Sequence, residues 1–343
     1  MPTNSLASAP CPRRITPRPR RFNWIACSGV ALFAVLSSAG APAGAQEAAA
    51  APRPHILGLA HVALFVHDIG LSRSFYKDFL GFDEPFSLKN KDGSLHLAWI
   101  KINDHQAIEL FPEKEPGSDR LYQISFETDD AEAMRLYLKS RGVAVPDHVP
   151  MGKSGTANFS VPDPDGHTVE FVQFLPGSWI ARDYGQHMPD TRISTRMPHA
   201  GILVHNLAAS LKFYGDLLGF RETWRGSKNG RTLSWANLTV PDGRDYVEFM
   251  LYDALPTAAR RGTMHHVCLE VADVPKAAEI LKSRPMTKES RKPGDVAIGI
   301  NGKRQVNFYD PDGTRIEIME PQTASGKPVP PSPAPPPGQA AGG

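Results

Sequence analysis

The feature that most constrains this chain of 343 residues is an internal repeat. Residues 60–82 contain the segments Ala-His-Val-Ala-Leu-Phe-Val and Ser-Arg-Ser-Phe-Tyr-Lys-Asp-Phe-Leu-Gly-Phe, and residues 198–220 repeat the same order of residue types. The two copies match at one offset, because 199 − 61 = 138 separates His61 from His199. An ungapped match of this length indicates a duplicated unit. Each copy predicts a short strand followed by an amphipathic helix that ends at a glycine.

The two ends of the chain differ in composition from a folded domain. Residues 1–45 contain five arginines and no acidic residue, an apolar run over 24–36, and Ala-Gly-Ala directly before Gln46. This pattern predicts a cleaved signal peptide, whose apolar run is too short to span a membrane, and hence an exported protein that is periplasmic or secreted. Its Arg-Arg pair leaves both the Sec and the twin-arginine route open. The Pro-rich, Ala-rich residues 322–343 predict a disordered tail.

Removal of the leader changes the charge and the cysteine content of the chain. The net charge falls from +2 to −3, since 2 − 5 = −3, so the mature chain has no basic footprint for nucleic acid. No membrane span is expected in it either. Two of the three cysteines belong to the leader, which leaves Cys268 alone and excludes an internal disulfide. We therefore expect a fold that depends on its apolar core and a small-molecule substrate as its partner.

Four related segments fill residues 55–321. The first and third are the repeat described above. The second and fourth each contain a strand, a helix and an Asp-Pro-Asp-Gly turn followed by a strand, at 121–126, 131–140 and 163–171 and at 265–270, 274–283 and 310–318. In these turns proline presets φ and glycine takes the left-handed position. We predict an α+β chain of two modules, 55–175 and 197–321, joined by a linker at 176–196.

Three of these features together resemble the vicinal oxygen chelate (VOC) superfamily. They are the tandem βαβββ units, the Phe-Tyr and Leu-Gly-Phe pattern of the helix, and the ending Asp-Pro-Asp-Gly-x-x-x-Glu. The superfamily includes glyoxalase I, methylmalonyl-CoA epimerase, fosfomycin and bleomycin resistance proteins, and extradiol dioxygenases. The resemblance implies that the two units of each module form a half-barrel cup, with metal ligands on the first and last strands of the units. It does not select the reaction, because one fold hosts several chemistries.

The resemblance implies four metal ligands in the second module: His199, Glu248, His266 and Glu317. Two imidazoles and two carboxylates suit a divalent Zn, Ni, Co, Mn or Fe ion, and these donors do not choose among them. The corresponding residues of the first module form a weaker second site: His61, Glu109, Gln123 and Glu170. It is weaker because the glutamine oxygen is a neutral donor. We expect Cys268 to fill the floor of the second cup as a small apolar residue, with a thiolate ligand or nucleophile as the alternative.

Three functions remain open. In a glyoxalase-like lyase or isomerase the metal binds two adjacent oxygens of the substrate, and Glu317 or Glu248 moves a proton. In an Fe(II) extradiol dioxygenase two histidines and Glu317 would form the metal-binding triad. Glu248 argues against this reaction because it occupies a further position, and Asn307 stands where ring-cleaving members usually have tyrosine. The third function is a non-catalytic, bleomycin-resistance-like binding protein with aromatic walls from Trp99, Phe111, Trp224, Trp235 and Tyr246.

Export restricts the substrate of the preferred function. Glutathione adducts and coenzyme A thioesters are not expected outside the cytoplasmic membrane, so we favour another small hydroxy-carbonyl compound.

The oligomeric state is left open by the sequence. Four units complete both cups within one chain, so a monomer suffices and a homodimer is the alternative.

Overall fold

The structure is a computed structural model that describes residues 52–261 and 264–333. All of these residues belong to one compact unit, Ala49–Gly343. The predicted signal peptide at 1–45 and residues 334–343 of the predicted tail lie outside the described residues. Within the described ranges, every helix is too short or too polar to cross a membrane.

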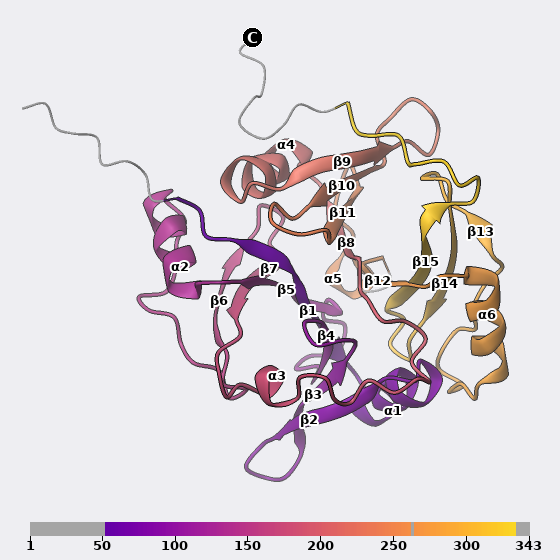
Figure 1. Cartoon of the computed structure of the whole chain (residues 1–343), viewed down its shortest axis with the longest axis horizontal. Helices are drawn as coiled ribbons and strands as arrows, with labels where there is room; N and C mark the ends of the chain where they lie inside the picture. Colours follow the sequence, from indigo (N-terminus) through magenta and orange to yellow (C-terminus); the bar gives the residue numbers. More distant parts are fainter. Residues whose placement is uncertain (1–51, 262–263, 334–343) are drawn as a thin grey trace, which may run out of the picture. The chain divides into compact units, whose positions relative to one another are not determined.

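The first module is a mixed sheet of seven strands in the order β2-β3-β4-β1-β5-β7-β6 (Figure 1). Its strands are β1 (Ile56–Val66), β2 (Asp83–Lys89), β3 (Leu95–Lys101), β4 (Ala107–Pro112), β5 (Leu121–Thr128), β6 (Ala157–Pro162) and β7 (Thr168–Gln173). In its centre β1 pairs parallel with β4 and antiparallel with β5. The inner face of this sheet, which bears His61, is called the first cup.

The second module repeats this arrangement with eight strands in the order β13-β14-β15-β12-β8-β11-β10-β9. Its strands are β8 (His199–Val204), β9 (Arg221–Gly226), β10 (Trp235–Thr239), β11 (Tyr246–Leu251), β12 (His266–Glu270), β13 (Ala297–Ile298), β14 (Lys303–Tyr309) and β15 (Arg315–Thr323). Here β8 pairs parallel with β11 and antiparallel with β12. The inner face of this sheet, which bears His199, is called the second cup.

The predicted α+β fold of two tandem modules is confirmed, with one difference in the second unit. Two strands, β6 and β7, follow its helix where three were expected. The segment before β6 makes only an isolated bridge between Met151 and Ala157, so it does not extend into a strand.

The helices α2 (Ala131–Ser140) and α6 (Val274–Ser283) have the predicted bounds. Each begins after an aspartate whose side chain accepts a hydrogen bond from a backbone N–H of the first turn, Asp130 from Ala133 and Asp273 from Lys276. Such caps satisfy donors that have no partner inside the helix.

The duplicated helices contain a wider turn than expected. The first starts as α1 (Ile69–Ser74) and continues as the π-helix η1 (Phe75–Phe79), and the other starts as α4 (Leu207–Ser210) and continues as η2 (Leu211–Leu217). Both end before a glycine with φ of 80°, Gly81 or Gly219, a conformation in which only glycine avoids a steric penalty. Two further short helices are α3 (Trp179–Arg182) and α5 (Ala258–Arg261).

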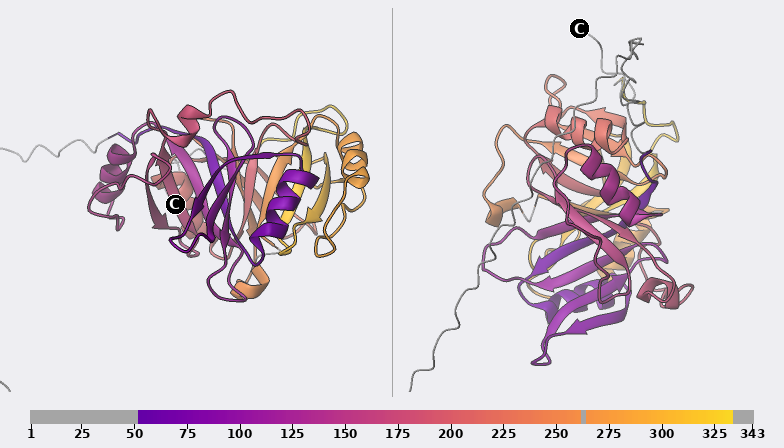
Figure 2. Two further views of the ribbon diagram at one scale, coloured as in Figure 1. Left: turned by 90° about the horizontal axis from the view of Figure 1, so that it is seen from below. Right: turned by 90° about the vertical axis from the view of Figure 1, so that its left-hand side faces the viewer.

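Each module receives a helix from the other module. The hydroxyl of Tyr76 in η1 donates to Oδ2 of Asp310 in the final turn of the second module, at 3.1 Å. The hydroxyl of Tyr214 in η2 donates to Oδ2 of Asp163 in the corresponding turn of the first module, also at 3.1 Å. Aromatic rings of η1 contact Phe308 of β14. Figure 2 shows α1 beside the yellow strands of the second module. The apolar core therefore continues from one module into the other.

The segments that follow the two modules differ. In the linker 176–196, α3 places Trp179 into the first cup, where its ring stacks on Phe86 with centroids 4.7 Å apart. After the second module, β15 reaches Thr323, and the backbone N–H of Ser332 donates to the carbonyl of Thr223. Backbone hydrogen bonds therefore connect residues of 322–333, the described part of the predicted tail, to the second module.

Candidate metal centre in the second module

The four predicted ligands lie on four neighbouring strands of the second cup. His199 begins β8 and His266 begins β12, while Glu248 and Glu317 lie in β11 and β15. Parallel pairing places Glu248 opposite Gly201 of β8 and Glu317 opposite Cys268 of β12. Because side chains alternate along a strand, these registers turn all four toward the inner face.

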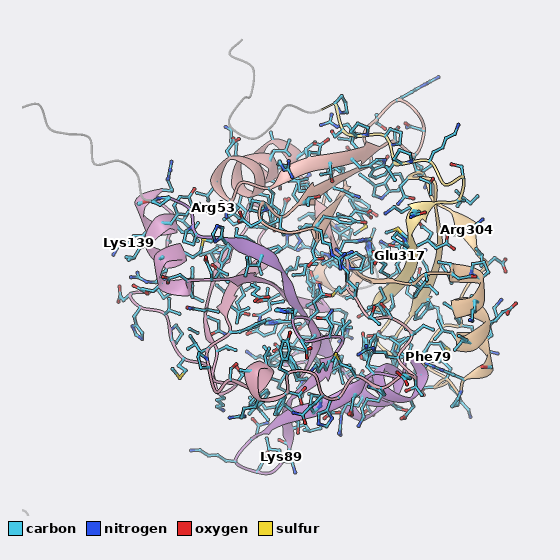
Figure 3. All side chains as sticks on the ribbon, in the orientation of Figure 1. Arg53, Phe79, Lys89, Lys139, Arg304 and Glu317 are labelled. Carbon is cyan, nitrogen blue, oxygen red and sulfur yellow. The ribbon has the colours of Figure 1, made fainter. Side chains whose placement is uncertain are left out.

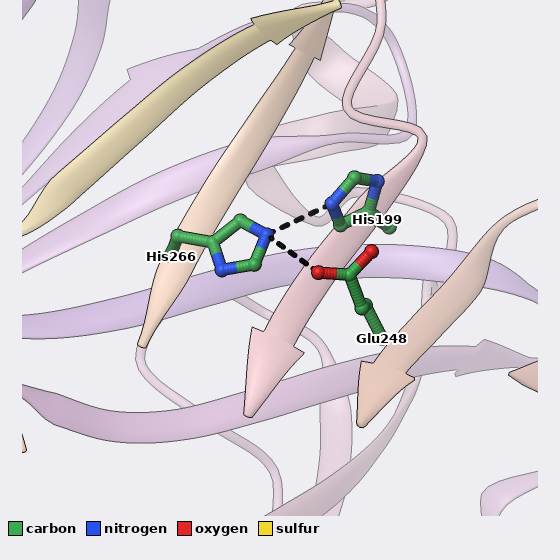
Figure 4. A group of neighbouring side chains, drawn as sticks. All are labelled: His199, Glu248 and His266. Carbon is green, nitrogen blue, oxygen red and sulfur yellow. Dashed lines mark hydrogen bonds and ion pairs between the residues drawn. The ribbon is translucent and has the colours of Figure 1, made fainter. Parts of the chain in front are cut away.

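The donor atoms of these four residues converge, and Figure 4 shows three of them, His199, Glu248 and His266. Nε2 of His199 lies 3.0 Å from Nε2 of His266 and 3.3 Å from Oε2 of Glu317. Nε2 of His266 lies 3.6 Å from Oε2 of Glu317 and 3.6 Å from Oε1 of Glu248. The sets His199–Glu248–His266 and His199–Cys268–Glu317 each place three donor atoms within 4.8 Å of one another. The structure therefore brings together the residues that the sequence singled out.

The close approach of His266 depends on Gly201, its antiparallel partner on β8. A Cβ added at Gly201 would lie 1.9 Å from Cε1 and 2.1 Å from Nδ1 of His266. The imidazole therefore occupies the space above a residue that has no side chain. This is what lets its Nε2 reach the other ligands.

Three of the predicted ligands have shifted pKa values, and the directions differ. Burial raises the pKa of Glu248, and the charge of Glu317 adds to this effect. Burial acts the same way on Glu317, but the hydrogen bond and charge of His199 outweigh it and lower the pKa of Glu317. Burial, together with the charge of Arg315, lowers the pKa of His266 well below its usual value. A neutral His266 with a free electron pair is the form that binds a metal.

Cys268 is fully buried and stands opposite His199. Burial raises the pKa of its thiol well above the usual value, and the charges of Glu317 and Glu248 raise it further. The thiol therefore stays protonated and neutral, as expected for a small residue at the floor of the cup.

A cavity of about 230 Å³ opens beside the ligands. Glu248 and Glu317 line it, together with Trp224 and Trp235 of β9 and β10 and with Arg315 of β15. A larger open groove of about 470 Å³, bordered by residues such as His105 and Arg244, contains none of the four ligands. The smaller cavity is therefore the one that a substrate of this centre would enter.

Comparison with known proteins assigns the family. Residues 58–171 and 196–318 match the model of the Glyoxalase/Bleomycin resistance protein/Dioxygenase superfamily. The chain belongs to this superfamily. It is also 27% identical over 128 residues to the uncharacterized protein YwbC of Bacillus subtilis, a match that covers 37% of this chain and 99% of YwbC.

Solved structures of the superfamily share the fold of this chain. A variant of homoprotocatechuate 2,3-dioxygenase from Brevibacterium fuscum is 18% identical, with a TM-score of 0.60 over 83% of this chain and 75% of the dioxygenase. The 2,3-dioxygenase LapB from Pseudomonas sp. KL28 is 17% identical, with a TM-score of 0.60 over 81% of this chain and 98% of LapB. At these identities the likeness establishes the fold alone.

The superfamily fold implies a divalent metal ion, and the residues of the second cup fit one. In the described ranges neither Glu248 nor Glu317 forms an ion pair with a lysine or arginine. The only basic side chains that the described residues place within ion-pair distance of these two carboxylates are His199 and His266, and burying carboxylate charge is costly without compensation. A dication between the two carboxylates and the two imidazoles would compensate it.

The corresponding residues of the first cup also lie together. Nε2 of His61 is 3.0 Å from Oε2 of Glu170, 3.5 Å from Oε2 of Glu109 and 3.0 Å from Nε2 of Gln123. Burial lowers the pKa of His61, but the charges of Glu109 and Glu170 outweigh it and raise that pKa to about 9. A protonated imidazole therefore supplies positive charge between the two carboxylates of the first cup.

The space beside the first set of ligands is filled by the linker. Trp179 packs with Leu97 and Trp99 on the inner face, and the remaining cavity is about 40 Å³. Phe111, expected as an aromatic wall, belongs to the same cluster. The first cup is therefore closed by the chain itself, whereas the second cup is open.

Arg315 is a charged residue of the second cavity that the sequence analysis did not single out. It lies two residues before Glu317 on the same strand, so the two-residue period of a strand places both on one face. The sequence alone could therefore have placed Arg315 on the inner face.

Of the other aromatic residues expected as walls, Trp224 and Trp235 line the cavity, whereas Tyr246 stacks on His199 with ring centroids 4.6 Å apart.

Proposed function

We propose that the second cup holds one divalent metal ion and that the protein is a glyoxalase-like lyase or isomerase. Its substrate is a small compound with two adjacent oxygen atoms. The observation that carries the proposal is the convergence of four donors beside a cavity that both glutamates line, with His199, His266 and Glu317 3.0–3.6 Å from one another and Glu248 3.6 Å from His266.

His199, His266 and Glu317 would hold the metal, with Glu248 as the fourth ligand. When bound, a divalent metal ion acidifies the C–H next to a chelated carbonyl group and stabilises the negative charge that develops. Glu317 is held by three neighbours, because it contacts both histidines and the thiol of Cys268. Among the described residues Glu248 lies within ion-pair distance of His266 alone, at 3.6 Å, and it lines the cavity. We assign it the transfer of the proton, because a carrier must move between two positions.

Export forms part of the proposal. The leader at 1–45 predicts that the mature chain works in the periplasm or outside the cell. Glutathione and coenzyme A adducts are not expected there, so the substrate would be another small hydroxy-carbonyl compound. A cavity of about 230 Å³ suits a molecule of that size.

Metal analysis of the purified chain, prepared without chelators or a His tag, tests the first step. We expect about one divalent metal ion per chain, as in other mononuclear sites. His266→Gln and Glu317→Gln should lose this ion. Glu170→Gln, at the position of the closed first cup that corresponds to Glu317, is the matched control and should retain it. A chain that takes up no metal after reconstitution, or that keeps it in both variants of the second cup, would contradict the proposal and leave a ligand-binding protein.

A ring-cleaving dioxygenase is the second candidate, and one observation favours it. His199, His266 and Glu317 alone form a triad of two histidines and a carboxylate, with Glu248 the least restrained of the four. The two reactions respond in opposite ways to Glu248→Gln. Loss of deuterium exchange into glyceraldehyde from heavy water would support the lyase or isomerase. Catechol-dependent oxygen uptake by the iron-loaded chain that persists in Glu248→Gln would support the dioxygenase instead.

A further inference from the structure

The two cups have an aromatic residue at the same position of the sheet, Phe86 in the first cup and Trp224 in the second, and different groups lie beside it. Phe86 of β2 is paired with Trp99, which is paired with Glu109. Trp224 of β9 is paired with Asn237, which is paired in the same way with Glu248. Phe86 and Trp224 are therefore equivalent positions, each two strands away from a matching glutamate.

In the first cup the chain itself shows what fits this wall. The indole of Trp179 lies nearly parallel to the ring of Phe86, with an interplanar angle of 12° and centroids 4.7 Å apart. This is the offset-stacked arrangement that aromatic rings favour. In the described part of the second cup no aromatic ring stacks on Trp224, which borders the open cavity. The cavity that Trp224 borders would therefore accept a flat ring, as the corresponding part of the first cup accepts the indole of Trp179.

The opposite side of the cavity provides a cation that lacks a carboxylate partner. Arg315 lines the cavity and, within the described ranges, has no carboxylate oxygen within 4.0 Å. Its Nε is buried without a hydrogen-bond partner, while Nη2 contacts Nδ1 of His266 and the sulfur of Met250. These are weak partners for a guanidinium, whose donors match both oxygens of a carboxylate.

Two isoleucines form an apolar part of the rim of the cavity, beside the polar residues Asn301 and Gln305. Ile298 and Ile300 line it although their side chains are 65% and 60% exposed. Exposed isoleucines at the edge of a cavity are a common feature of surfaces that cover a ligand. They would extend the apolar contact of a ring that lies against Trp224.

We propose that the substrate of the second cup is a small, flat, anionic compound. Its unsaturated or aromatic ring lies against Trp224 as Trp179 lies against Phe86, its anionic group binds Arg315, and its adjacent oxygens face Glu248 and Glu317. This inference rests on the proposed function, because the metal centre defines the end of the cavity at which the oxygens bind.

Three aryl hydroxamates separate the contributions of the metal, the ring and the anion. Benzohydroxamate carries adjacent oxygens and a ring, and 3- and 4-carboxybenzohydroxamate add only a carboxylate. Their affinities are measured by calorimetry on the zinc-loaded full chain and on the metal-free chain. We expect binding that requires zinc, with the better carboxy compound about tenfold or more tighter than benzohydroxamate, since a charge-assisted hydrogen bond contributes that much.

Substitutions then assign each contribution to a residue. Arg315→Gln should abolish the preference for the carboxylate, and Arg315→Lys should retain part of it. Arg304→Gln is the matched control, because Arg304 is paired with Glu320 at 3.1 Å and lies apart from Glu317 toward the outside of the same module (Figure 3). The preference for benzohydroxamate over acetohydroxamate should disappear in Trp224→Leu and remain in Trp224→Phe.

The outcomes distinguish this inference from the proposed function. Equal binding with and without zinc, or no binding at all, would overturn both. Zinc-dependent binding without a carboxylate preference, or with a preference that Arg315→Gln leaves unchanged, would overturn the anion site alone. Zinc-dependent binding in which Trp224→Leu has no effect on the ring preference would overturn the stacking wall.

Discussion

Replacement of Gly201 by alanine should remove metal from the second cup while leaving all four ligands in the sequence. The new Cβ would lie 1.9 Å from Cε1 of His266, whereas ordinary contact begins at 3.4 Å. The ring must therefore move by 3.4 − 1.9 = 1.5 Å. Metal–ligand distances tolerate only about 0.2 Å. His266 would thus be lost as a ligand.

The size of the effect follows from this displacement. Changes to groups that merely orient a ligand cost about 10–100-fold in metal affinity, so the loss of His266 should cost at least about 100-fold. Overpacking costs about 1–3 kcal/mol of folding stability, and the change from glycine to alanine returns about 0.4–1 kcal/mol through the unfolded chain. The free energy of unfolding of the metal-free protein should therefore fall by about 1–2 kcal/mol.

The first cup supplies the control for this prediction. There Ala63 of β1 is paired with Gln123 of β5, at the positions that Gly201 and His266 occupy in the second cup. The first cup thus combines a larger residue than glycine with a more flexible side chain than histidine. The double variant Gly201→Ala/His266→Gln reproduces this pair in the second cup. It should recover stability relative to Gly201→Ala without recovering metal. Competition with a chromophoric chelator gives the affinity, and urea unfolding with chelator gives the stability. Wild-type zinc affinity in Gly201→Ala would refute the reasoning.

Three further predictions concern other parts of the chain. The folded pKa of His61 is about 9 against 6.5 in the unfolded chain, so its stabilisation is complete below pH 6.5 and is lost as the pH rises through 9. The loss is at most about 3.4 kcal/mol, from 2.5 pH units at 1.36 kcal/mol each. A urea series with chelator should show this loss in the wild type but not in His61→Gln. Tyr76→Phe leaves the buried carboxyl of Asp310 without its hydroxyl donor and should lower the free energy of unfolding by about 1–3 kcal/mol; an unchanged urea midpoint would contradict the contact between the modules. Mass spectrometry of the exported protein should find Gln46 at its N-terminus, and an uncut chain would refute the predicted signal peptide.

Local signals in the sequence predicted the elements that depend on local interactions. The bounds of α2 and α6 followed from apolar periodicity, and the aspartates that precede these helices cap them in the structure. Both Asp-Pro-Asp-Gly segments form turns, with Gly166 and Gly313 at positive φ. The four ligands predicted for the second cup were chosen because their spacing within the repeat matched the superfamily, and the strand registers bring these residues together.

Contacts between distant residues carried no such signal. The first aspartate of each turn looked purely geometric, yet Asp163 and Asp310 accept tyrosine hydroxyls from the opposite module. These pairs are 51 and 234 residues apart in the chain, and neither partner has a local pattern that identifies the other. The closing of the first cup by Trp179 is of the same kind, because an aromatic residue in a linker does not reveal which surface it covers.

The segment that follows each module explains why one cup is closed and the other open. Trp179 lies nine residues after Glu170, and the residue nine positions after Glu317 is Gly326. No aromatic residue occurs between Ala324 and the end of the chain. The described part of this segment still passes along the second cup, since Ser332 bonds to β9 and Val329 borders a neighbouring cavity of about 160 Å³. It places no ring against Trp224, so the duplicated scaffold fills the first cup with its own indole, whereas the described residues leave a cavity at the equivalent surface of the second cup.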